Sequence, residues 1–279
     1  MKTFYQALVA TVVVTAAFLG SAAYADANST KAPNETYTPS VGQEGKDVVW
    51  VPTSQALVDR MLDMAKLTPR DLLVDLGSGD GVTVITAAKR GAKARGIEYN
   101  PDMVALSRAR AKAAGVESRA TFEEGDIFES RFSDANVVTL FLLPELNVRL
   151  RPILLEMEPG TRIVANSFSM GDWEADETAE VTEGCETYCR ALMWIVPAKV
   201  EGSWTVDGKR LDLKQSFQKL EGTLGDGASA TPLSAGRLEG ARIQFSVGND
   251  KYVGEVRGSR MQGTINGSRR WQASRNAGS

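Results

Sequence analysis

The stretch "LLVDLGSGDGVTVITAAKRGAKARGIEYNP", from Leu72 to Pro101, decides the fold of the first part of the chain. Its opening apolar run predicts a short buried strand that ends at a cluster of glycines. A helical segment follows, and "KARGIEYN" predicts a second strand. A strand, a glycine-rich turn, a helix and a further strand in this order are typical of a parallel sheet covered by helices.

The same alternation extends on both sides of this stretch, over residues 47–197. "SQALVDRMLDMAKL" has the apolar spacing of an amphipathic helix, and short apolar runs alternate with helical segments as far as Val196. Asn100, Pro101 and Asp102 predict a helix start, because Asn is a good N-cap, Pro fits the first turn and Asp complements the helix dipole. We therefore expect a Rossmann-like, doubly wound α/β domain with a mostly parallel sheet.

The pattern changes after Pro197. Residues 198–279 show alternating polar and apolar positions, frequent glycine and no helical period. Several short strands at a spacing of about 8–12 residues predict a small antiparallel β-barrel or sandwich.

The glycine cluster at 77–81 has three possible interpretations. A Walker loop requires a lysine after its spacer, and the first lysine here is Lys89. A dinucleotide fingerprint would place its third glycine at position 82, which is Val82, so an oxidoreductase is disfavoured. The S-adenosylmethionine loop has the pattern hydrophobic-x-D-x-G-x-G-x-G, and "VDLGSGDG" at 74–81 fits it at each position, with glycines at Gly77, Gly79 and Gly81.

Three carboxylates stand where that cofactor requires them. Asp75 ends the first strand, where it can hold the cationic ammonium group. Glu98 ends the second strand, where it can accept hydrogen bonds from both ribose hydroxyls. After the third strand, Asp126 can accept from the adenine amino group while Ile127 packs on the ring. The turn glycines remove side chains that would collide with the methionyl part.

These residues carry a family resemblance. From about Trp50 to Phe168 the chain resembles class I S-adenosylmethionine-dependent methyltransferases. In particular, it is similar to bacterial methyltransferase-domain proteins related to the ATP-synthase c-subunit lysine N-methyltransferase family. The matching segments are "WVPTSQALVDRML", "DLGSGDG", "GIEYNP", "GDIF", "VVTLFLLPELNVRLRP" and "GTRIVANSFSMGDW". The resemblance implies that Pro52 and Thr53 close over the cofactor, and it gives the β-rich module no counterpart.

The sequence contains fewer indications of the site that binds the methyl acceptor. The loop "LPELN" at 143–147 lacks the Asn/Asp-Pro-Pro-aromatic tetrad of nucleobase amino-methyltransferases. Glu145 is a candidate catalytic residue that orients an amine or takes its proton, and equally a carboxylate favoured by a helix N-terminus. Trp173 and Tyr99 are expected to be packing residues. The chain has no histidine and only two cysteines, so we expect no metal site.

The N-terminus predicts export. Lys2, an apolar run and "AYA" at 23–25 have the pattern of a signal peptide over residues 1–25, and an uncleaved membrane anchor is the alternative. Residues 26–46 are predicted to be a flexible leader. A periplasmic location would favour a disulfide between Cys185 and Cys189. The bond requires a turn, since positions four apart on a straight strand lie roughly 13 Å from each other. Two unpaired thiols are the alternative.

Two functions remain open. The first is a methyltransferase with S-adenosylmethionine as cofactor, which N-methylates a protein lysine or another amine. The second is an exported, non-catalytic module that binds an adenosyl ligand and recognises its partner through the β-rich domain. No arginine-rich run supports nucleic-acid binding. The methyl acceptor and the oligomeric state stay open.

Overall fold

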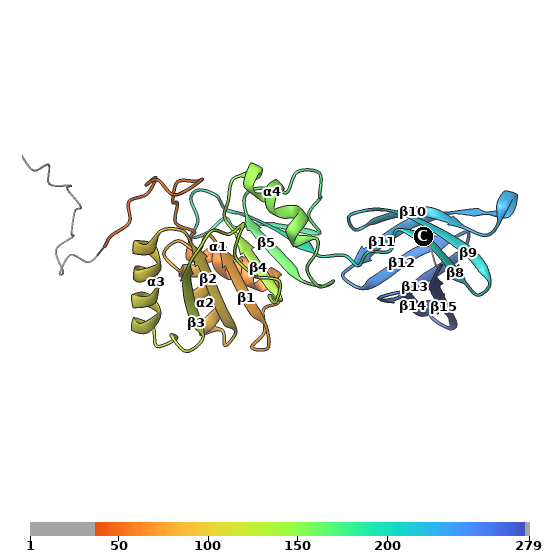
Figure 1. The fold of residues 1–279 in the computed structure, drawn as a ribbon, viewed down its shortest axis with the longest axis horizontal. Coiled ribbons are helices and arrows are strands. Elements are labelled where there is room, and N and C mark those ends of the chain that lie inside the picture. The colour runs from red at the N-terminus through yellow and green to blue at the C-terminus, as the bar shows by residue number, and fades with distance from the viewer. Residues whose placement is uncertain (1–36, 277–279) are drawn as a thin grey trace, which may run out of the picture. The chain divides into compact units, whose positions relative to one another are not determined.

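A computed structural model describes residues 37–276 of the 279-residue chain (Figure 1). The predicted signal peptide and the part of the predicted leader up to residue 36 lie outside the described residues. Among residues 37–276, no helix is both long and apolar enough to span a bilayer.

The first domain is built on a seven-stranded sheet with the order β3-β2-β1-β4-β5-β7-β6. The first five strands in the chain pair in parallel, whereas β7 pairs antiparallel with both β5 and β6. The predicted Rossmann-like α/β fold is thus confirmed. The strands are β1 (Leu72–Leu76), β2 (Lys93–Glu98), β3 (Ala120–Glu124), β4 (Val137–Leu140), β5 (Arg162–Asn166), β6 (Glu177–Glu180) and β7 (Arg190–Ile195).

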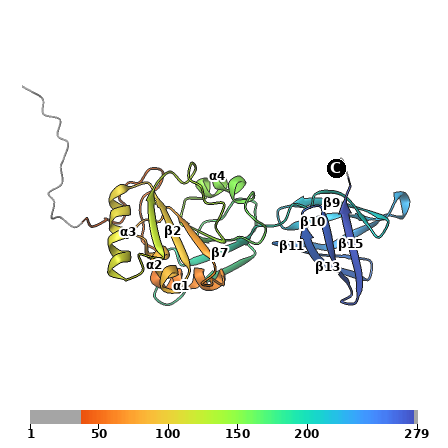
Figure 2. The same cartoon turned by 60° about the horizontal axis from the view of Figure 1, so that its bottom comes forward.

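Helices cover both faces of this sheet, because its central strands are apolar on both sides. Strand β4 is buried at each of its four residues. One core cluster joins the sheet to α1, α2 and α3, and a second joins it to α4 and two tryptophans. Figure 2 shows α1 and α4 on opposite sides of the sheet. The helices are α1 (Gln55–Met64), α2 (Val82–Lys89), α3 (Pro101–Ala113) and α4 (Pro144–Leu154).

Two details of this sheet differ from the sequence prediction. The apolar run "ANVVTLFLLP" at 135–144 has the composition of one long strand, but only Val137–Leu140 pairs in the sheet, and the remainder leads to α4. Strand β6 was not predicted, because "ETAE" is exposed at three of its four positions and lacks apolar alternation.

The second domain is a closed antiparallel barrel of eight strands. Pairing of β15 with β8 closes it, so the structure is the barrel rather than the sandwich of the two predicted alternatives. Its core contains Trp204, Phe245, Tyr252 and Trp271. The strands are β8 (Gly202–Val206), β9 (Lys209–Ser216), β10 (Lys219–Leu224), β11 (Thr231–Glu239), β12 (Arg242–Val247), β13 (Asp250–Arg257), β14 (Arg260–Ile265) and β15 (Arg269–Arg275), with a short 3-10 helix at Gly227–Ser229.

Candidate functional site

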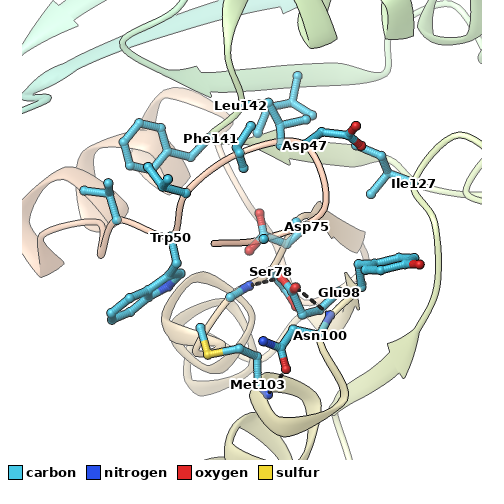
Figure 3. Close-up of a pocket in the computed structure, with 18 of the residues that line it drawn as sticks. Asp47, Trp50, Asp75, Ser78, Glu98, Asn100, Met103, Ile127, Phe141 and Leu142 are labelled. Carbon is cyan, nitrogen blue, oxygen red and sulfur yellow. Dashed lines mark hydrogen bonds between the residues drawn. The ribbon is translucent and has the colours of Figure 1, made fainter. Parts of the chain in front are cut away.

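A cavity of about 590 Å³ lies at the carboxyl ends of the parallel strands, around β1. The strand order reverses between β1 and β4, and ligands of such sheets bind at this point. In Figure 3, Asp75 lies between Phe141 and Leu142 on one side and Glu98, Asn100 and Met103 on the other. Further lining comes from the glycine turn, the loops after β3 and β5, the loop before β7, the segment 43–53 and single turns of α1, α2 and α4.

The glycine turn approaches the cavity as a bare backbone. Gly77 and Gly79 have φ values of +78° and +52°, which a residue with a side chain seldom adopts. A Cβ atom on Gly79 would lie 2.7 Å from the indole nitrogen of Trp50. Gly81 has a different place from the one predicted. It is the N-cap of α2, packs against Phe122 and is not part of the cavity lining.

Asp75 is a buried acid at the floor of the cavity. It accepts a hydrogen bond of 2.6 Å from the Thr139 hydroxyl, and only 7% of the residue is exposed. Burial is the main cause that raises its pKa to about 7; the hydrogen bond from Thr139 opposes this shift, and the nearby carboxylates Glu98 and Asp80 add to it. Within residues 37–276, no Lys or Arg pairs with it. A buried carboxylate without a cation is a fitting partner for a positively charged ligand.

Glu98 and Asp126 line the same cavity. The Glu98 carboxylate accepts hydrogen bonds from the backbone N–H of Gly79 (2.8 Å) and of Asn100 (2.9 Å), so it holds the turn while facing the cavity (Figure 3). Asp126 accepts from the backbone N–H of Phe128 at 2.9 Å and forms an ion pair with Lys46. The hydrogen bond from Lys46 lowers the pKa of Asp126. The structure therefore brings the three predicted acids, with Ile127, around one space.

The segment 43–53 forms one side of this space and includes residues that the sequence analysis assigned to the leader. The backbone N–H of Trp50 donates to the Gln43 carbonyl at 2.9 Å, which holds the segment in a turn. Lys46 also lies 5.1 Å from the centre of the Tyr99 ring. Thr53 lines the cavity, whereas Pro52 does not. Trp50 and Lys46 were missing from the predicted site, although Trp50 belongs to the quoted "WVPT" segment.

An aromatic group lines the part of the cavity that lies across Asp75 from Glu98, where Figure 3 shows Phe141. Phe141, Phe168 and Tyr188 line it together with Leu142, and the sequence analysis named none of the three rings as a site residue. A single sequence gives no signal for them, because each comes from a different loop. Tyr188 is brought there by a turn that the Cys185–Cys189 disulfide closes.

Of the other candidates, Tyr99 lines the cavity, whereas Glu145 and Trp173 do not. Glu145 is exposed in the first turn of α4 and is not among the residues that line the cavity, a position that suits the helix-dipole interpretation. Trp173 is fully buried, with its ring 6.2 Å from that of Trp194, as expected of a packing residue. The same expectation was wrong for Tyr99, which is 53% exposed at the cavity edge. Over the part of the chain that the structure describes, no cluster of three or more potential metal ligands is found.

Comparisons with known proteins agree with this geometry. A profile of the ANTKMT methyltransferase domain matches residues 75–177. A protein-lysine N-methyltransferase of Saccharolobus islandicus is 41% identical over 140 residues, which are 49% of this chain and 87% of that protein. The mouse lysine N-methyltransferase of the ATP-synthase c-subunit is 39% identical over 139 residues, 50% of this chain and 55% of the mouse protein.

A solved structure is similar over the same region. The crystal structure of an RNA methyltransferase from Salinibacter ruber in complex with S-adenosyl-L-homocysteine is 45% identical, with a TM-score of 0.51. The match covers 54% of this chain and 96% of the other. The chain thus spans most of the archaeal and Salinibacter proteins but little more than half of the mouse relative. All three matches leave about half of this chain uncovered.

Proposed function

Because the chain belongs to the S-adenosylmethionine-dependent methyltransferase family of the archaeal protein-lysine N-methyltransferase, we propose that it methylates the ε-amino group of a lysine in a partner protein. The observation that carries this proposal is the cavity itself. Its acid-lined part matches a cationic nucleoside, and its aromatic end matches an amine-bearing side chain.

Different residues of the chain bind different parts of the cofactor in this proposal. S-adenosylmethionine supplies a methyl group on a positively charged sulfur. In the proposed arrangement Asp75 binds the ammonium end of this cofactor, Glu98 accepts from its ribose hydroxyls and Asp126 accepts from its adenine amino group. The bare backbone at Gly77 and Gly79 leaves room for the methionyl chain.

The apolar end of the cavity favours the uncharged, reactive form of the acceptor amine. An amine attacks only with a free lone pair, and the removal of water from around an ammonium group lowers its pKa. Phe141, Leu142 and Phe168 provide such an environment. The acceptor ammonium would first lose its proton to water. Its nitrogen lone pair would then form the N–C bond as the S–C bond of the cofactor breaks, and the methylated ammonium product would carry the positive charge. Alignment of the two reactants accounts for most of the rate in such a displacement.

The charge around the aromatic end favours a protein over RNA as the acceptor. Between residues 163 and 189 the chain has seven Asp and Glu residues and no Lys or Arg. Four of the seven form ion pairs with basic residues elsewhere in the chain, which leaves Glu180, Glu183 and Glu186. Among them, Glu183 and Glu186 are exposed in the loop that carries Tyr188. Carboxylates attract a lysine side chain and repel the phosphates of RNA, which proteins bind through basic residues.

The test is transfer of a labelled methyl group. The full chain is incubated with methyl-labelled S-adenosylmethionine and a cell extract, and the products are digested with protease or with ribonuclease. We expect label in protein, on lysine by mass spectrometry, and none with Asp75→Asn. If ribonuclease releases the label, the acceptor is RNA and the proposed protein acceptor is wrong. If the wild type binds the cofactor but transfers no label, the proposed methyltransferase function is wrong.

We further propose that the protein is exported, as the N-terminal pattern predicts. The Cys185–Cys189 disulfide supports this location, because disulfides persist in oxidising compartments and are rare in the cytoplasm. Cell fractionation of the full chain and of a chain lacking residues 2–25 provides the test. Recovery of both forms in the cytoplasm would contradict export.

A further inference from the structure

Three aromatic rings from separate loops meet at one end of the cavity. Phe141 follows β4, Phe168 follows β5, and Tyr188 precedes β7. The ring centres of Phe141 and Phe168 lie 6.2 Å apart with nearly parallel planes, and the Tyr188 ring lies 5.3 Å from Phe141 and 5.8 Å from Phe168. We call these three residues the aromatic wall. Tyr188 is 45% exposed, so the wall reaches from the cavity to the surface.

The backbone beneath the wall is held by hydrogen bonds between its loops. The Asn147 side chain on α4 donates to the carbonyl of Phe168 at 3.2 Å. Ser167 and Arg190 are joined twice, through the backbone N–H of Ser167 to the Arg190 carbonyl (2.7 Å) and through the Arg190 guanidinium to the Ser167 carbonyl (3.0 Å). Because Arg190 directly follows Cys189, these bonds connect the Phe168 loop to the disulfide loop.

Tyr188 depends on the disulfide for its place. Its φ of +55° is in the left-handed region, which residues with a Cβ seldom adopt. The Cys185–Cys189 bond closes a loop of five residues around it, with the two Cα atoms 5.7 Å apart. Without that bond, the residues of this surface loop would be free to take more favourable backbone conformations, and the Tyr188 ring would leave the wall.

The surroundings of the wall attract cations. Glu183 precedes the disulfide loop and Glu186 lies within it, and neither forms an ion pair within residues 37–276. The nearby cation Arg190 donates to the Ser167 carbonyl. The faces of aromatic rings also attract ammonium groups, and Lys and methylated Lys side chains pack their apolar stems against such rings.

We propose that the aromatic wall binds the amine side chain of the methyl acceptor, and that the Cys185–Cys189 disulfide maintains this binding by holding Tyr188 against Phe141 and Phe168. This assignment rests on the proposed lysine methyltransferase function. It divides the cavity into an acid-lined part for the cofactor and an aromatic part for the acceptor. A change in the wall therefore affects the acceptor and leaves cofactor affinity unaltered.

The experiment measures binding and turnover separately. The full chain loaded with S-adenosylhomocysteine is titrated with a short peptide containing Nε-trimethyl-lysine and with the same peptide containing norleucine. We expect the charged peptide to bind several-fold more tightly, and Tyr188→Ala to weaken it by about tenfold, within the roughly 2- to 30-fold range of a cation–π contact. Tyr188→Phe keeps the ring and should bind as the wild type does.

The double variant Cys185→Ser, Cys189→Ser tests the disulfide. We expect it to reproduce the loss seen with Tyr188→Ala, and we expect no further loss when Tyr188→Ala is added to it. The matched control is Ile153→Ala, a 41% exposed hydrophobic residue on α4 outside the cavity lining, which should change neither peptide affinity nor cofactor affinity. Thermal unfolding of each variant verifies that it is folded.

Turnover separates the two proposals. With a lysine peptide as acceptor, Tyr188→Ala should raise KM by about the same factor as the peptide affinity falls, with kcat changed less than about twofold. If the wild type and Tyr188→Ala methylate and bind the peptides equally, the proposed role of the aromatic wall in acceptor binding is refuted, whereas the proposed lysine methyltransferase function is not. If no amine is ever methylated while the trimethyl-lysine peptide still binds through Tyr188, the proposed lysine methylation is wrong, and the proposed binding of ammonium groups by the aromatic wall is supported.

Discussion

The pKa of Asp75 makes the affinity for S-adenosylmethionine depend on pH. The carboxyl group titrates near pH 7 in the folded chain, because it is buried and surrounded by other acids. Its proposed partner is the ammonium group of the cofactor, which attracts the ionised carboxylate and not the neutral acid. Binding therefore requires Asp75 to lose a proton, and affinity should increase as the pH rises through 7.

The magnitude follows from the fraction of Asp75 that is ionised. With a pKa of about 7, roughly 3% is ionised at pH 5.5 and about half at pH 7.0. If only the ionised form binds, the dissociation constant falls about 15-fold between these two values. Above pH 7.0 the expected increase ends, because α-amino groups themselves begin to lose protons near pH 8.

Calorimetric titration with S-adenosylhomocysteine, which has the same ammonium group, measures this change. Repeating the titration in buffers of different ionisation enthalpy counts the protons released, and we expect close to one per molecule bound at pH 5.5. Asp75→Asn should bind weakly and equally at both pH values. A wild-type affinity that stays within twofold between pH 5.5 and 7.0, with no proton release, would refute the assignment of Asp75 to the ammonium.

The raised pKa of Asp75 also determines how the free energy of unfolding changes with pH. Folding raises the pKa of Asp75 from 3.8 to about 7, so between these values the folded chain holds a proton that the unfolded chain has lost. The free energy of unfolding without cofactor should therefore decrease as the pH rises from about 4 to 7 and level off above 7. Urea denaturation of the wild type and of Asp75→Asn isolates this contribution, and a contribution that grows with pH would contradict it.

Three further changes separate binding from folding. Glu98→Gln removes the charge that accepts two backbone N–H groups at the glycine turn, and we expect S-adenosylhomocysteine to bind about tenfold more weakly in calorimetry. Gly79→Ala places a Cβ against the Trp50 indole and should weaken cofactor binding by a similar factor. Gly115 also has a positive φ but lies in open space, so Gly115→Ala should leave cofactor binding unchanged. Equal effects of the two substitutions would show that the contact with Trp50 is not the cause. Arg162→Met leaves the largely buried Asp71 unpaired, so urea denaturation should show a loss of about 2 kcal/mol with cofactor affinity intact.

The acid-lined part of the site was predictable because topology places it. Asp75, Glu98 and Asp126 lie at or just after the ends of parallel strands, and the carboxyl ends of neighbouring parallel strands meet at one edge of a sheet. A local pattern of strand, turn and acid is therefore enough to infer that these residues share a cavity. The helix start at Asn100 was predictable for a similar reason, since its side chain caps the backbone two residues away.

The rest depends on contacts between distant segments. Trp50 covers Gly79 from 29 positions earlier in the chain, and Lys46 pairs with Asp126 across 80 positions. No periodicity in the sequence reports such contacts. The choice between barrel and sandwich was likewise open, because it depends on pairing between β15 and β8, the last and first strands of that domain.

The order of strands assigns the two parts of the cavity to two parts of the chain. The acids and the glycine turn come from residues 72–127, around β1, β2 and β3, on one side of the switch point. The aromatic wall comes from residues 141–188, around β4, β5 and β7, on the other side. The hydrogen bonds that hold Glu98 stay within the first group, and the one from Asn147 to Phe168 stays within the second, whereas Thr139 on β4 donates to Asp75 across the switch point. Substitutions in Phe141, Phe168 or Tyr188 should therefore alter the choice of acceptor without altering cofactor affinity.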